Sequence, residues 1–273
     1  LEESEQNDIF SALNRILTEF DSHEQIVISS LPIWNGVAKR MRAQRNARIV
    51  YDCYDLLEGF GDVADDILAA ENTLLEMSDW VVFSADSLLD HHTARRPAVE
   101  GKSLLLPNAV DPSHFKPVDK VVRPLQSCKP PCIGYVGSMH HWLDVDAVIH
   151  AARQRPDWQF KFVGRQERSI FESLRQLPNV QFTGEVPYRD LPITMAQFDV
   201  ALIPFKIMPL TLATNPVKLY EYFACGLPVV SSALPEVLRY VELVEIYRDG
   251  QDLINKIELA MREWARRDSL AAA

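Results

Sequence analysis

A lysine and a glutamate three residues apart stand directly behind a Thr-Asn-Pro sequence in the stretch TNPVKLYEYFACGLPVVSS, residues 214–232. Pro216 suits the first position of a helix, and Asn215 or the threonine before it suits the N-cap. The dipole of a helix disfavours a cation in the first turn, where Lys218 falls, whereas the free amides there favour an anion. This arrangement indicates a bound anion, with Glu221 one turn deeper.

The spacing suits a diphosphate at the helix start and a ribose beside the carboxylate. The amides of Val217 and Lys218 would face the phosphates, and Glu221 would accept hydrogen bonds from ribose hydroxyls. The alternative is a Lys218–Glu221 surface pair on an amphipathic helix. That alternative leaves unexplained the Thr-Asn-Pro start and the small Ala-Cys-Gly end, which would bring the helix close to a sheet.

Two earlier apolar stretches end in glycine turns of the kind that let a backbone approach a ligand. IGYVGSMHHW ends its strand at Gly137, and His140 and His141 follow where a ligand would pass. FKFVGRQER ends its strand at Gly164, and Arg165 could reach a phosphate from there. Each turn taken alone is equally compatible with a tight connection that binds nothing.

Short apolar runs alternate with longer amphipathic stretches, a pattern typical of parallel sheets with crossover helices. The first part predicts strands at 25–30, 47–55, 80–85 and 103–110, with helices at 11–20, 35–46 and 62–78. The second part predicts strands at 132–138, 160–164, 180–184, 200–205, 228–232 and 244–249, with helices at 142–155, 166–176, 188–197, 216–225 and 250–267.

Five prolines between residues 111 and 131 mark a linker. The predicted fold is therefore α/β, with two Rossmann-like, doubly wound parallel-sheet domains facing a cleft. The N-terminal domain covers 1–110 and is incomplete, the linker covers 111–131, and the C-terminal domain covers 132–256. A helix over 257–273 could pack back on the N-terminal domain. Ligands of such sheets bind at the carboxyl ends of the strands.

Composition narrows the function further. The net charge of −10 argues against a nucleic-acid binder, and no apolar run approaches the roughly 18 residues of a membrane span. The chain starts at Leu1 without a signal peptide, so we expect further residues upstream in the native product. Of four scattered cysteines only CKPPC holds a close pair, and none stands at zinc-site spacing, so we expect reduced thiols in the cytoplasm and no metal site.

The stretch WNGVAKRMRAQRNAR carries five cations from Lys39 to Arg48, no acid, and the apolar residues Trp34, Val37 and Met41. A basic amphipathic helix of this kind can lie on anionic lipid. The charges spread around most of the helix, so a solvated helix explains the stretch equally well. We therefore predict a cytoplasmic protein, with peripheral membrane contact through Lys39–Arg48 as an open alternative.

Taken together, the motifs resemble the GT-B glycosyltransferases, and within them the retaining enzymes similar to family 4. The resemblance covers about residues 25–240 and is stronger in the second half. It rests on stretches that occur in the family's order: IVYDCYD, LLPNAVDPSHF, IGYVGSMHHWLDVDAV, PDWQFKFVG, NVQFTGEVPYRDLP, FDVALIPF and NPVKLYEYFACGLPVVSS.

The resemblance implies an enzyme that moves a sugar from a nucleotide-diphosphate donor to an acceptor hydroxyl of a polysaccharide, glycolipid or similar molecule, with retention and without a further cofactor. The C-terminal domain would bind the donor and the N-terminal domain the acceptor. The residues implied in donor binding are Gly137, Ser138 and Arg165 near the diphosphate, Gly184, Glu185 and Val186 beside the base, Asn215, Pro216, Val217 and Lys218 at phosphate and sugar, and Glu221 at the ribose.

Three departures from the family pattern concern catalysis. Ala213 stands where the family often has the first glutamate of a Glu-x7-Glu pair, and no Arg or Lys clamp follows the first strand of the donor domain. Tyr54, next to Asp55, replaces a frequent histidine. The catalytic candidates are therefore Tyr54, Asp55 and His140.

Two other functions remain open at this stage. The first is a non-catalytic protein that binds a nucleotide sugar, or a partner subunit, with this fold. The second is an epimerase or phosphorylase of the same fold. The N-terminal domain also lacks the glycine-bearing first strand of a full acceptor domain, so the chain is either a shortened fragment or a family member that has lost part of that side.

Overall fold

The computed structural model describes residues 3–20, 24–117, 130–167 and 171–271, with side chains in the last helix described as far as Glu263. The chain forms two compact units. The first comprises Leu1–Pro107 together with Ala213–Asn215, and the second comprises Asn108–Leu212 and Pro216–Ala273. The predicted linker lies mostly outside the described residues.

The first unit holds a four-stranded parallel sheet in the order β1-β2-β3-β4. Its strands are β1 (Ile26–Ser29), β2 (Arg48–Cys53), β3 (Trp80–Phe83) and β4 (Ser103–Leu105). Its helices are α1 (Glu3–Glu19), α2 (Asn35–Arg45), α3 (Asp65–Met77), α4 (Asp86–Arg95) and α5 (Pro97–Glu100), with 3-10 turns η1 (Pro32–Trp34) and η2 (Leu57–Phe60).

One face of this first sheet is covered. Successive strands are neighbours and all run the same way, so right-handed crossovers place the connecting helices on a single face. The side chains of the opposite face are apolar but open: Ile28, Trp80 and Leu104 are 69%, 52% and 51% exposed. Apolar residues on both faces are typical of a sheet covered twice. Within the described residues only half of the predicted doubly wound pattern is present.

The second unit holds a six-stranded parallel sheet in the order β10-β9-β8-β5-β6-β7. Its strands are β5 (Cys132–Val136), β6 (Gln159–Val163), β7 (Val180–Gly184), β8 (Val200–Ile203), β9 (Val229–Ser231) and β10 (Val244–Ile246). Its helices are α6 (Val145–Gln154), α7 (Glu172–Arg175), α8 (Leu191–Met195), α9 (Pro209–Leu212), α10 (Val217–Ala224), α11 (Pro235–Leu238) and α12 (Gly250–Ala271), with a 3-10 turn η4 (Tyr188–Asp190).

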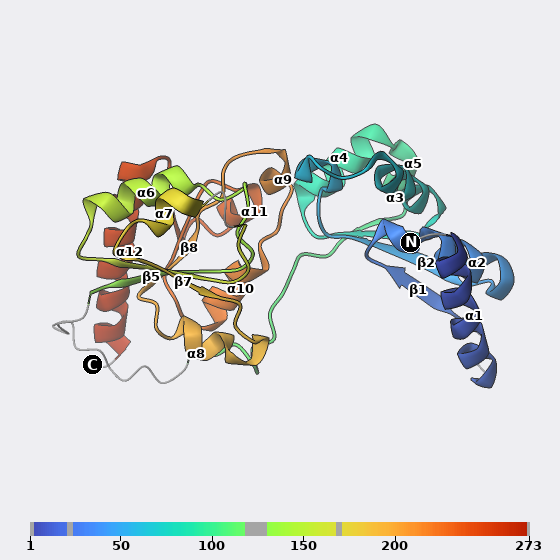
Figure 1. Ribbon diagram of the computed structural model, residues 1–273, viewed down its shortest axis with the longest axis horizontal. Helices are drawn as coiled ribbons and strands as arrows, with labels where there is room; N and C mark the ends of the chain where they lie inside the picture. Colours follow the sequence, from blue (N-terminus) through green and yellow to red (C-terminus); the bar gives the residue numbers. More distant parts are fainter. Residues whose placement is uncertain (1–2, 21–23, 118–129, 168–170, 272–273) are drawn as a thin grey trace. The chain divides into compact units, whose positions relative to one another are not determined.

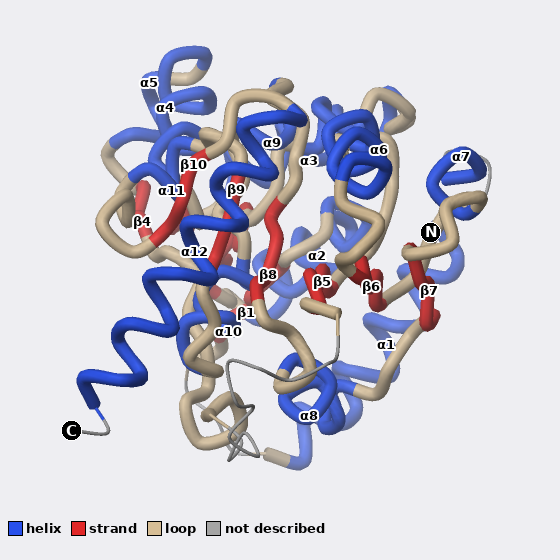
Figure 2. Tube along the Cα trace, turned by 90° about the vertical axis from the view of Figure 1, so that its left-hand side faces the viewer, coloured by secondary structure: helices blue, strands red, loops and turns tan. Residues whose placement is uncertain are grey.

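The strands of the second sheet are all parallel, but their order reverses between β5 and β8, so its helices cover both faces. Figures 1 and 2 show α6 on one side of the strands and α8 and α10 on the other. Every residue of β5 and β8 is buried. Ile257 and Ala260 of α12 pack into the same core. A strand order that reverses in this way creates a crevice at the carboxyl ends of the strands, where ligands of doubly wound sheets bind.

Several predicted elements differ from the observed ones. The predicted helix at 166–176 is wrong in its first part, because Gln166 forms a parallel bridge with Met139 and α7 begins only at Glu172. The predicted strand at 103–110 ends at Leu105. The helices α4, α5, α9 and α11 were not predicted, since three of them have only four residues and α4 is polar.

The basic stretch forms α2, and its apolar side faces protein. Val37 and Met41 are 6% and 4% exposed. Among the cations, Arg42 pairs with Asp79 and Arg45 donates to Asn14 Oδ1 at 2.7 Å. Nothing in the described structure supports the predicted membrane contact through Lys39–Arg48. None of the described helices combines the length and apolar composition needed to cross a bilayer.

Candidate functional site

Three glycines stand side by side at the carboxyl ends of β5, β6 and β7. Gly137, Gly164 and Gly184 have φ values of 138°, 134° and 76°, which side-chain-bearing residues rarely adopt. The amide of Gly137 donates to Val163 O at 2.9 Å, and the amide of Gly164 donates to Gly184 O at 2.8 Å. A Cβ on Gly164 would lie 2.2 Å from Gly137 O. The three turns therefore form a tight backbone platform at the predicted ligand edge.

Helix α10 supplies the charge beside this platform. A Cβ on Gly137 would lie 3.1 Å from Lys218 Cε, so the lysine stem lies directly over the first glycine turn. The ammonium lies 4.9 Å from the centre of the Phe205 ring and 5.5 Å from that of Tyr135. Such cation–π contacts hold a lysine in place while leaving its hydrogens directed elsewhere. The geometry thus brings a positive charge to the turn that the sequence identified.

The start of α10 differs by one residue from the prediction. Pro216 is the N-cap, in an extended conformation with ψ 110°, and the helix begins at Val217. Asn215, predicted as the N-cap, lies one position earlier and is 2% exposed. Lys218 is still in the first turn, so the predicted relation between the helix start and the cation holds.

Hydrogen bonds that involve two buried tyrosines position α10 and the turn after β5. Tyr222 of α10 accepts a hydrogen bond from the Val136 amide at 2.9 Å, which ties α10 to the last residue of β5. Tyr135 donates to Ser138 O at 2.8 Å and so shapes the turn after Gly137. The platform and the helix are positioned from within the core of the second unit.

Glu221 lies half-buried one turn after Lys218. Burial raises the pKa of its carboxyl, while the charges of Lys218 and His114 act to lower it. The His114 ring stacks on Tyr188 with centroids 4.7 Å apart, and His114 Nε2 lies 3.1 Å from Tyr188 O. Tyr188 is 59% exposed. A carboxylate that could accept from hydroxyls therefore has an aromatic pair beside it.

Sequence reasoning missed the aromatic residues of this site. Tyr135, Phe205, His114 and Tyr188 all lie within or next to the stretches that carry the family resemblance, but aromatic residues in a core sequence gave no sign of a role at a site. Only the fold brings them beside Lys218 and Glu221.

The other predicted residues of the second unit lie on the turns at the same edge. His140 Nδ1 is 3.3 Å from Glu167 Oε2, and its ring stacks on Trp142 with centroids 4.6 Å apart. Arg165 is exposed, and its backbone oxygen accepts from Met139 N at 2.8 Å. The exposed residues Ser138 and Glu185 and the partly buried Val186 complete the set.

The candidates of the first unit follow β2. Tyr54 is 38% exposed, and its backbone oxygen accepts from Ser84 Oγ at 2.9 Å. Burial, Asp55 and Asp52 raise the pKa of the Tyr54 hydroxyl. Ala213, at the position of the missing glutamate, is 4% exposed and packs in the apolar cluster of the first unit.

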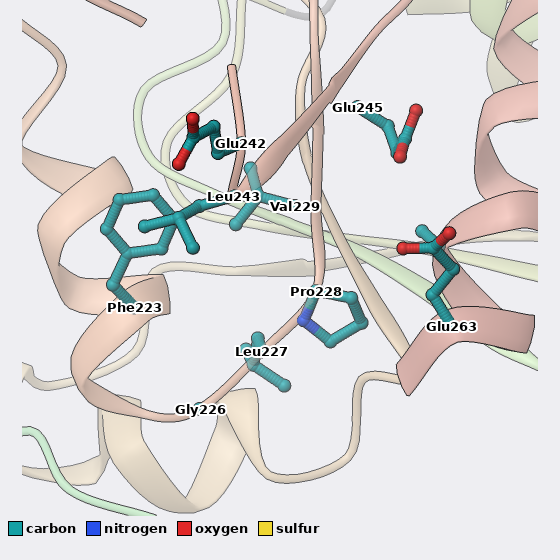
Figure 3. Close-up of a pocket in the computed structure, with 10 residues that line it drawn as sticks. Phe223, Gly226, Leu227, Pro228, Val229, Glu242, Leu243, Glu245 and Glu263 are labelled. Carbon is teal, nitrogen blue, oxygen red and sulfur yellow. The ribbon is translucent and has the colours of Figure 1, made fainter. Parts of the chain in front are cut away.

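A cavity of about 270 Å³ occupies a different part of the second unit (Figure 3). It opens where Pro228 and Leu243 lead into β9 and β10, at the amino ends of the strands. Glu242, Glu245 and Glu263 surround its apolar floor. Three carboxylates would repel a phosphate, and the cavity lies at the opposite ends of the strands from the candidate site.

Comparison with known proteins matches this geometry. Residues 130–262, just under half of the chain, match the family model of the glycosyl transferases group 1. The fold matches sucrose-phosphate synthase from Thermosynechococcus elongatus with a TM-score of 0.75 and 20% identity, over 96% of this chain and 70% of that one. The chain has the GT-B fold, and its residues 130–262 are similar to the glycosyl transferases group 1.

Other matches agree with this identification. Anabaena HepE, solved in complex with UDP and glucose, matches this GT-B chain with a TM-score of 0.70 and 18% identity, over 95% of this chain and 77% of that one. TuaH of Bacillus subtilis (strain 168), named as a glycosyltransferase of teichuronic acid biosynthesis, is 29% identical over 204 residues, 69% of this chain. The chain spans about half the length of TuaH, 51%.

Proposed function

We propose that this protein transfers a sugar from a nucleotide-diphosphate donor to an acceptor hydroxyl, and that the second unit binds the donor. The observation that carries the proposal is the Lys218 stem over the Gly137 turn, with Glu221 one helical turn away. A cation over a platform of glycine turns suits a diphosphate. The HepE structures with UDP and with UDP-glucose support a nucleotide-sugar ligand.

The diphosphate is the leaving group of this reaction, and charge builds on it as the bond to the sugar breaks. Lys218 and the amides at the start of α10 would stabilise that charge, and exposed Arg165 is placed to add to it. In this proposal the donor is the only nucleotide required and no cofactor takes part. Transfer proceeds with retention, with the acceptor hydroxyl attacking on the leaving-group side.

The rest of the donor has a place on the same edge. Glu221 would accept hydrogen bonds from the ribose, and the turn of Gly184, Glu185 and Val186 would flank the base. The exposed face of the Tyr188 ring, backed by His114, offers the base a stacking surface. Tyr54, Asp55 and His140 are the proposed catalytic residues.

The acceptor we propose is a polysaccharide or lipid-linked carbohydrate in the cytoplasm. Support for a polysaccharide comes from the name of TuaH, which assigns that relative to teichuronic acid biosynthesis. The alternative, a protein that binds a nucleotide sugar without transferring it, is favoured by Ala213 at the position of the family glutamate and by Tyr54 at that of the histidine.

A thermal-shift screen with UDP-, GDP-, ADP- and TDP-sugars tests donor binding, because a ligand of the folded state raises the unfolding temperature by mass action. We expect one base to stabilise the chain. Release of the nucleotide diphosphate with an acceptor present then distinguishes transfer from binding alone. Absence of stabilisation by all four classes would contradict the proposed site.

A further inference from the structure

The first unit buries three side chains that are able to bind a metal, and the proposed function uses none of them. Cys53 ends β2, Glu71 lies in the middle of α3, and His92 lies near the end of α4. They are 1%, 5% and 3% exposed. Their ligand atoms all lie within 4.8 Å of one another. Three elements thus converge on one small polar space inside an apolar core.

The distances suit a tetrahedral zinc ion. Zinc binds sulfur at about 2.3 Å and imidazole nitrogen at about 2.0 Å, which at a tetrahedral angle places the two ligand atoms about 3.5 Å apart. Cys53 Sγ and His92 Nε2 are 3.7 Å apart. A mixed set of thiolate, imidazole and carboxylate favours zinc over the harder magnesium and calcium ions.

The neighbouring groups hold these ligands in orientation. Tyr51 donates to Glu71 Oε1 at 2.9 Å, as residues around metal ligands commonly do. The His92 ring stacks on Phe83 with centroids 5.5 Å apart, and its Nδ1 has no hydrogen-bond partner among the described residues.

Hydrogen bonding alone explains the cluster less well. A hydrogen bond between the buried Cys53 thiol and the His92 imidazole adds little stability, and the Glu71 carboxyl is costly to bury even though the charge of Arg96 acts on it. A divalent ion would replace the protons of these groups and compensate their charge.

We propose that Cys53, Glu71 and His92 supply three ligands of a tetrahedral zinc site that joins β2 to α3 and α4, with a water molecule as the fourth ligand. No sequence motif indicates this site, because the ligands are 18 and 21 residues apart and lie on three different elements. The ion would stabilise the folded first unit. It would take no part in donor binding, so the site stands or falls independently of the proposed function.

Cobalt provides the direct test on the full chain. After dialysis against a chelator, titration with Co²⁺ should produce a thiolate-to-cobalt charge-transfer band that saturates at one ion per chain, and Zn²⁺ should displace it. Added Zn²⁺ should also raise the unfolding temperature. Absence of the band from the wild-type chain would overturn the proposal without any variant.

Variants identify the ligands. Cys53→Ser should remove the band and weaken Zn²⁺ binding by more than about 10-fold, and Tyr51→Phe should weaken it by about 10- to 100-fold. Cys225→Ser is the matched control, because Cys225 is a buried thiol whose sulfur lies 3.9 Å from that of Met195. It should keep both band and affinity. A band that persists in Cys53→Ser, in chains shown to be folded by circular dichroism, would contradict the assignment.

Discussion

The two parallel sheets of this chain end in opposite kinds of chemistry. In the second unit, β5, β6 and β7 end in closely packed glycine turns, and Lys218 adds a positive charge beside them. In the first unit, β2 ends among acids: Asp52 is in the strand, Asp55 follows it, and Tyr54 lies between them in sequence. Phosphate is attracted to the first arrangement and repelled by the second.

The sheets also differ in how they are covered. In the second sheet the strand order reverses between β5 and β8, and helices cover both faces. In the first sheet the strands follow one another in sequence order, and apolar residues such as Ile28 and Trp80 are exposed on one face. A crevice at a switch point exists only in a sheet that reverses. This difference is the reason we propose the second unit for the donor, and the proposal can be tested on both units.

The largest effect should come from the glycine platform itself. Gly164→Ala combines a φ of 134° with a Cβ 2.2 Å from Gly137 O, so we expect a loss of about 3 kcal/mol or more in the free energy of unfolding. Gly184→Ala is the control: its φ of 76° costs about 1–2 kcal/mol, but its Cβ would meet nothing within 4 Å. Urea unfolding measures both, and equal losses would contradict the close approach.

The second-largest effect should be the loss of nucleotide affinity in Lys218→Ala. A charge-assisted contact to phosphate contributes about 1.5–3 kcal/mol, so affinity should fall about 10- to 150-fold. Lys256→Ala removes a lysine of the same unit that pairs with Glu245 at 2.9 Å, and it should leave affinity unchanged. Calorimetry with UDP makes the comparison. Unchanged UDP affinity in a folded Lys218→Ala chain would show that α10 does not form the donor site.

Glu221→Gln should change stability and binding in opposite directions. Because burial raises the pKa of Glu221, its carboxyl stabilises the fold only while protonated, and that contribution disappears as pH rises through the folded-state pKa. The variant should therefore be more stable than the wild type at pH 7, with the difference disappearing below the ordinary pKa of 4.5.

The same variant should bind the nucleotide sugar about tenfold more weakly, since the amide replaces a charged acceptor of ribose hydroxyls. Unfolding curves at pH 4 and pH 7, together with calorimetry at pH 7, measure the two effects. A variant that gains stability and loses no affinity would show that Glu221 is buried for another reason.

Tyr54→Phe should have the smallest effect on the donor. It changes one hydroxyl of the first unit, so nucleotide affinity should stay within about twofold. If Tyr54 is catalytic, the rate of transfer should fall by at least about 10-fold while donor affinity is kept. Loss of nucleotide binding would show that the two sheets do not divide the work as proposed.

Local patterns determined much of this protein in advance. Strand periodicity predicted ten parallel strands, glycine turns indicated the edge that we propose for the ligand, and helix-end physics selected Lys218 and Glu221. These are short-range properties, because a turn that needs a positive φ must carry glycine and a helix start must expose its amides. The predicted helix boundaries were less accurate: Pro216 is the N-cap of α10 and not its first residue, and α7 begins at Glu172, six residues after the predicted start.

Only the tertiary structure decided what depends on residues far apart in sequence. The rings of Tyr135 and Phe205 meet Lys218 across 83 and 13 residues, and Cys53, Glu71 and His92 converge from one strand and two helices. The direction in which each sheet is wound, and so which face is covered, is likewise set by strand order. Each strand is apolar in sequence whether or not a second layer covers it, and packing alone distinguishes the two cases.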